Sequence, residues 1–111
     1  MENLYDQLIR MSELNCYTVS RDIPARMKAD AHGVTINYQS GGELFIPRAI
    51  VETAIGRLVR QRSLNKDEVH PEITSEHGPM TDRLMAVLRM LPGVEIKKKV
   101  LRELVYRGPG Y

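Results

Sequence analysis

The chain of 111 residues carries 16 Lys and Arg against 14 Asp and Glu, a net charge of +2, and 42% of its residues are hydrophobic. This length predicts a single domain over residues 1–111 that buries a core without disulfides. One cysteine excludes an internal disulfide framework and is typical of a reducing compartment. No run approaches the roughly 20 apolar residues of a membrane-spanning helix, and acids follow Met1 where a signal peptide would carry basic residues. We therefore expect a cytoplasmic protein with no membrane association.

The first part of the chain predicts one helix followed by an antiparallel meander. Residues 3–14 place apolar side chains at helical spacing, and Asn3 with Asp6 three residues later could cap that helix. Alternating apolar residues and paired glycines then indicate short strands joined by tight turns. The strands are expected at residues 16–20, 27–31, 34–38 and 43–46, with turns at 32–33 and 39–42.

Residues 47–62 predict an amphipathic helix with a basic outer side. Six apolar residues recur at i, i+1, i+4, i+5, i+8 and i+9 from Ile50, which fits the helical period. Pro47 could occupy the first turn, where its missing N–H costs nothing. The outer side carries a single acid, Glu52. Its basic residues, together with those just beyond the helix, are Arg48, Arg57, Arg60, Arg62 and Lys66. One side of this helix would brace the core, and the other would present positive charge to an anionic partner.

Two further helices are predicted before the last part of the chain. Asn65 could cap a short one, because Glu68 three residues later completes a capping pair, and Pro71 limits its length. A stronger helix covers residues 80–91, and Pro92 with Gly93 ends it.

The helix at residues 80–91 is apolar over nearly its whole surface, since Met85 and Met90 widen the stripe. A helix of this kind is either deeply buried or covered by a partner. Methionine is also adaptable at contact surfaces. The pattern therefore leaves open a two-sided core and a partner or homodimer interface.

Residues 94–106 fit either a strand or a helix. Val94 and Ile96 favour a strand, and lysines at residues 97–99 would oppose the dipole of a helix beginning there. We therefore expect a strand, with residues 107–111 forming a loose tail. The predicted fold class is α+β: a small antiparallel sheet of three or four strands packed with three main helices.

The modest net charge conceals segregation along the chain. Residues 1–30 sum to −1, residues 31–66 to +3, residues 67–82 to −5 and residues 83–111 to +5. If the two basic segments share one face, the domain gains a positive patch suited to nucleic acid.

The order of elements resembles that of winged helix-turn-helix domains. The resemblance rests on residues 64–69, the helix at 80–91 and the wing-like segment at 94–106. It implies that residues 81–91 enter the major groove of DNA while the wing contacts phosphates. The groove-side candidates are Thr81, Arg83 and Arg89. The candidate phosphate contacts on the wing are Lys97, Lys98 and Lys99.

Other interpretations of the basic residues remain open. Arginines near a helix C-terminus favour the helix dipole, and lysines protect an exposed strand edge from pairing with another chain. The five acids at residues 67–82 would repel phosphate. A protein-binding winged helix, or an unrelated α+β domain, would explain the acids and the additional strands.

No residue pattern predicts catalysis, a cofactor or a metal. Acids and His70 and His77 gather at residues 67–77, but their spacing matches no closed zinc motif, so a solvated acidic loop is the better interpretation. Cys16 is expected to be a small buried hydrophobe. The sequence thus favours a non-enzymatic nucleic-acid-binding module. The alternative is a regulatory adaptor or assembly subunit, homodimeric through the helix at 80–91.

Overall fold

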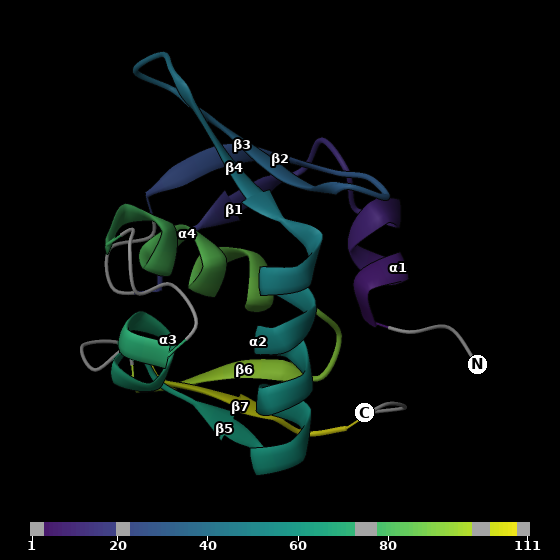
Figure 1. The fold of residues 1–111 in the computed structure, drawn as a ribbon, viewed down its shortest axis with the longest axis vertical. Coiled ribbons are helices and arrows are strands. Elements are labelled where there is room, and N and C mark those ends of the chain that lie inside the picture. Colours follow the sequence, from purple (N-terminus) through teal and green to yellow (C-terminus); the bar gives the residue numbers. More distant parts are fainter. Residues whose placement is uncertain (1–3, 20–22, 73–77, 99–102, 109–111) are drawn as a thin grey trace.

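A computed structural model describes residues 4–19, 23–72, 78–98 and 103–108 (Figure 1). The described part is an α+β fold with two antiparallel sheets and four helices, so the predicted fold class is confirmed. The elements in chain order are α1 (Leu4–Arg10), β1 (Asn15–Tyr17), β2 (Pro24–Ala29), β3 (Gly33–Tyr38), β4 (Glu43–Pro47), α2 (Arg48–Gln61), β5 (Ser63–Leu64), α3 (Lys66–Glu72), α4 (Gly78–Leu88), β6 (Val94–Lys98) and β7 (Glu103–Tyr106).

Strands β1 to β4 form the first sheet in sequence order, and we call it the meander sheet. Its register pairs Met27 with Ile36 and Ile36 with Leu44. Alternate side chains point to opposite faces of a sheet. Met27 and Ile36 are fully buried on one face, whereas Arg26 and Lys28 on the other face are exposed. The predicted meander therefore forms with one face in the core and one in solvent.

The N-terminal helix is shorter than the sequence predicts. Helix α1 ends at Arg10, and its buried residues are Tyr5 and Leu8. The proposed cap, Asn3, lies outside the described residues. The N–H of Met27 donates to Leu14 O, and the N–H of Glu13 donates to Met27 O, so residues 13–14 run alongside β2. These bonds replace the last turn of the predicted helix.

Helix α2 follows β4 directly through Pro47, whose φ of −57° suits a helix start. Its buried face carries Val51, Ala54, Ile55 and Leu58. The helix ends at Gln61, and its C-cap, Arg62, has a left-handed φ of 67°. The predicted amphipathic helix is confirmed within one residue at each end.

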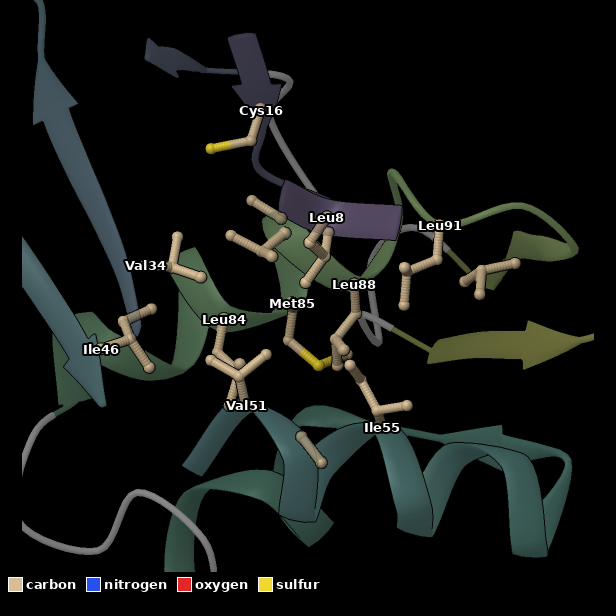
Figure 2. Packing of buried hydrophobic residues seen from close by; sticks show 14 of the residues in the cluster. Leu8, Cys16, Val34, Ile46, Val51, Ile55, Leu84, Met85, Leu88 and Leu91 are labelled. Atoms are coloured by element: carbon tan, nitrogen blue, oxygen red, sulfur yellow. The ribbon is translucent and has the colours of Figure 1, made fainter. Parts of the chain in front are cut away.

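Helix α4 lies at the centre of the molecule. Figure 2 shows Leu84, Met85 and Leu88 between α2 on one side and the strands carrying Val34 and Ile46 on the other. All five residues from Leu84 to Leu88 are fully buried. The nearly all-round apolar pattern therefore reflects a two-sided core within one chain. Because these five side chains are fully buried, they are not accessible to a second copy of the chain.

Strands β5, β6 and β7 form a second sheet in the order β5-β7-β6, which we call the small sheet. The described residues 94–98 and 103–106 are thus strand, as favoured, but they form two strands with Ile96 opposite Leu104. Arg107 is not loose: its N–H donates to Gly93 O at 2.6 Å, and its Nε lies 2.8 Å from Glu95 Oε2. Among the described residues, no helix is long and apolar enough to cross a membrane.

Candidate nucleic-acid interface

The start of α3 is fixed against the end of α2 by side-chain hydrogen bonds. Asn65 Oδ1 accepts from Glu68 N at 3.0 Å, and Glu68 Oε1 accepts from Asn65 N at 3.2 Å. The predicted capping pair is therefore present. Gln61 Nε2 donates to the second carboxylate oxygen of Glu68 at 2.7 Å, and Gln61 Oε1 accepts from Arg57 Nε at 3.1 Å. A chain of contacts from Arg57 to Glu68 thereby sets the relative position of the two helices.

Four predicted basic residues gather at this junction, and we call them the α2–α3 basic cluster. They are Arg57, Arg60, Arg62 and Lys66. Arg57 is half-buried and the other three are exposed. The Arg62 guanidinium lies 5.5 Å from the centroid of the Tyr106 ring, which restrains it over the small sheet. Asp67 and Glu68 are the acids in the first turn of α3, so within residues 57–68 positive groups outnumber negative ones four to two.

Both predicted groove-side arginines donate hydrogen bonds to backbone carbonyl oxygens of the same chain. Arg83 is 7% exposed, donates from Nη1 to Ile23 O at 3.0 Å, and lies 5.0 Å from the centroid of the Tyr38 ring. Arg89 Nη1 donates to Tyr17 O at 3.2 Å and to Thr18 O at 3.0 Å. Both guanidiniums therefore join α4 to the segment around β1.

The third groove-side candidate, Thr81, is also buried, at 5% exposure. The reason is that the meander sheet covers the side of α4 that the winged-helix resemblance would turn toward DNA (Figure 1). Of the α4 side chains that the structure describes, only Asp82 is not buried, so this part of the helix has little surface with which to enter a groove. Thr81 and Arg83 therefore leave the set of candidate contact residues.

The remaining predicted basic residues belong to other elements than the cluster or to the far end of α2. Arg48, at the opposite end of α2, lies 4.5 Å from the Tyr5 ring centroid, pairs with Glu52 and donates to Ala31 O at 3.3 Å. Lys97 and Lys98 are exposed on β6, the outer strand on the far side of β7 from β5. Lys99 lies outside the described residues. The structure thus brings together four of the ten residues.

The alternative chemistries gain no support from the described residues. Within that part of the chain, no group of three His, Cys, Asp or Glu could hold a metal. Glu76 and His77 lie outside it. Cys16 is fully buried, as expected, and its burial raises the pKa of the thiol. Such a thiol is a weak nucleophile.

A shallow hollow of about 170 Å³ lies between α1 and α2, lined by Leu4, Tyr5, Glu52, Ile55 and Gly56. Its polar groups are already engaged. Glu52 pairs with Arg48, and the Tyr5 hydroxyl donates to Asp30 O at 2.6 Å. Burial raises the pKa of Tyr5, which keeps that hydroxyl protonated. The hollow therefore offers no reactive group.

Comparison with protein-family models, with curated proteins and with solved structures gives no significant match. One further group of exposed residues was missed by the sequence reasoning: Arg26, Lys28 and Phe45, on the outer face of the meander sheet. The alternation along residues 24–29 and 43–47 indicates that these side chains share one face of a sheet, but it does not indicate which of the two faces is buried.

Proposed function

We propose that the protein is a non-enzymatic nucleic-acid-binding module whose α2–α3 basic cluster contacts the phosphate backbone. The observation that carries the proposal is the gathering of four basic side chains at a junction held by the contacts from Arg57 to Glu68. Cations that neutralise phosphates release bound counterions, which drives association without reading sequence. The exposed side chains Arg60 and Lys66 are the main contributors.

The order α2, β5, α3, α4, β6 and β7, with the small sheet ordered β5-β7-β6, supports the winged-helix likeness of this part. The likeness does not extend to the use of α4. Since the meander sheet covers that helix, the proposed mode is contact with the backbone and not base reading through the major groove. Binding would then depend strongly on salt and weakly on sequence.

A double variant, Arg60→Ala with Lys66→Ala, tests the proposal. Fluorescence anisotropy against random duplex DNA at two salt concentrations should show weaker binding than wild type. The slope of log affinity against log salt should fall by roughly 1–2, because two phosphate contacts are lost. Both side chains are exposed, so the melting temperature should hold.

The matched control is Lys97→Ala with Lys98→Ala, which removes the same charge from β6, two strand positions from β5 in the small sheet. We expect a smaller loss of affinity from the control pair than from the cluster pair. Equal losses would mean that only net charge matters. Absence of binding by the wild-type protein at low salt would refute the proposal.

An adaptor role is the second candidate. The interface first considered, the helix at residues 80–91, has its central side chains inside the core. Leu14 and Ile23, which are 55% and 43% exposed beside β1, favour a partner at that edge of the meander sheet. Sedimentation velocity of wild type and Leu14→Lys across protein concentration tests it. A monomer at every concentration, with no partner retained on purification, would remove this candidate.

A further inference from the structure

The meander sheet has one uncovered face. Helices α2 and α4 pack against its inner face, and no described element lies over the outer one (Figure 1). An antiparallel sheet can expose one face to water, and such a face is normally polar. Here two large aromatic side chains remain partly exposed on it: Phe45, at 48%, and Tyr17, at 42%.

The strand register gathers the outward side chains into two rows. Lys28 lies opposite Thr35, and Thr35 lies opposite Phe45. In the neighbouring row, Arg26 lies between Asn15 and Asn37. Adjacent strands are about 4.8 Å apart, so Lys28 and Phe45 are separated by roughly 10 Å. Two cations, an aromatic ring and several amide or hydroxyl groups therefore share one patch.

The ring of Phe45 packs over Gly33. A Cβ added at Gly33 would lie 2.7 Å from Phe45 Cζ and 2.9 Å from Cε1, so the ring occupies the space that a side chain would fill. Covering a glycine is a known structural use of an aromatic on a sheet. The same contact fixes one side of the ring while nearly half of the side chain stays exposed. A ring that is already ordered loses little entropy when a planar group stacks on it.

The two cations in the middle of the patch favour an anionic partner. Arg26 and Lys28 are both exposed. The nearby acids are Glu43, at the β4 end of the Arg26 row, and Asp30, just after β2, whose carboxylate accepts from the N–H groups of His32 and Gly33. The Lys28 row contains no acid. Aromatic rings beside cations, with polar groups between them, suit a chain that presents both flat bases and phosphates.

We propose that the outer face of the meander sheet binds single-stranded nucleic acid. A base stacks on Phe45, the side chains of Arg26 and Lys28 contact phosphates, and Asn37 and Thr35 offer hydrogen bonds to base edges. Duplex DNA does not satisfy this surface, because its bases are already stacked on one another. The proposal does not rest on the α2–α3 basic cluster, which lies on other elements.

Variants at Phe45 test the stacking contact. The substitution Phe45→Leu keeps an apolar side chain over Gly33 but removes the aromatic face, and Phe45→Tyr keeps that face. The probe is a labelled thymidine oligonucleotide of about 15 residues, followed by anisotropy at low salt. We expect Phe45→Leu to bind roughly tenfold more weakly than wild type and Phe45→Tyr to bind like wild type. Thermal melting of each variant checks that the fold is retained.

Two further measurements separate the surfaces and the occupants. Phe45→Leu should weaken oligonucleotide binding by the same factor in the Arg60→Ala, Lys66→Ala background as in wild type. Phe45→Leu should leave the affinity for duplex DNA unchanged. Polyglutamate of matched charge should compete poorly, since it has no bases to stack. Equal binding of the oligonucleotide by wild type and Phe45→Leu overturns the proposal, and so does competition by polyglutamate at the same concentration as the oligonucleotide. Oligonucleotide binding without duplex binding would contradict the cluster proposal alone.

Discussion

The guanidinium of Arg83 donates a hydrogen bond to the carbonyl oxygen of Ile23, 3.0 Å away and 60 positions distant along the chain. Arg83 is 7% exposed and its charge also faces the ring of Tyr38. This contact ties the central helix α4 to the meander sheet. The sequence suggested Arg83 as a DNA-contacting residue, but this hydrogen bond gives it a structural role inside the protein.

Replacing Arg83 with Ala should destabilise the fold. The change leaves the Ile23 carbonyl without this donor and removes packing beneath Tyr38, so we expect a loss of about 2–4 kcal/mol in the free energy of unfolding. Urea denaturation measures it. Arg60→Ala, on an exposed turn of α2, is the control and should change stability by less than about 0.5 kcal/mol. Similar curves for the two variants would contradict the structural role of Arg83.

Shortening Met85 tests whether α4 is a core helix or an interface. Met85 is fully buried, so Met85→Ala should cost about 2–5 kcal/mol through lost apolar contacts and a cavity. Met90 is only half-buried, and Met90→Ala should cost clearly less. Chemical denaturation compares the two at one protein concentration. A dimer interface would instead make the stability of wild type depend on protein concentration.

Removing the cap of α3 should weaken the junction that holds the basic cluster. Asn65→Ala deletes the acceptor for Glu68 N, and we expect a cost of about 1 kcal/mol. Asn65→Asp or Asn65→Ser retains an acceptor and should recover most of it. Urea midpoints give the stability, and no difference between Asn65→Ala and Asn65→Ser would argue against the capping contact.

The turn before β3 should make stability depend on pH. Asp30 Oδ1 accepts from His32 N at 2.7 Å and from Gly33 N at 3.2 Å, and these bonds lower the pKa of the carboxyl, that from His32 most. A lowered folded-state pKa means that the contribution is present above the unfolded value of about 3.9. It is then lost as the pH falls through the folded value.

The variant Asp30→Asn can accept similar bonds but does not titrate. Melting temperatures of wild type and Asp30→Asn between about pH 2 and pH 6 check this prediction. The advantage of wild type over the variant should shrink as the solution becomes more acidic. A difference that is constant across that range would show that Asp30 is not the titrating group.

Local patterns in the sequence determined most of the element types. The helical period at residues 50–59 predicts α2, alternation at residues 34–38 predicts β3, and the spacing of Asn65 and Glu68 predicts the start of α3. These signals work because capping, turn geometry and side-chain periodicity act over a few residues. Where bonds to another strand compete with the helix, as those of Glu13 and Leu14 to Met27 do, the same signals set the end of α1 too far along the chain.

Only the tertiary structure decided which surfaces remain exposed. An apolar α4 could be covered by other elements of the same chain or by a second protein. Nothing within residues 80–91 indicates that the meander sheet covers it. Arg89 reaches the carbonyls of Tyr17 and Thr18 across more than 70 positions, as Arg83 reaches Ile23, so their roles depend on contacts between distant segments. The basic residues were all visible in the sequence. Packing divides them into the cluster at α2 and α3, two lysines on β6 and the buried Arg83 on α4. The physical reason is that secondary structure is set by neighbours in sequence, whereas burial of a charge is set by whichever element covers it.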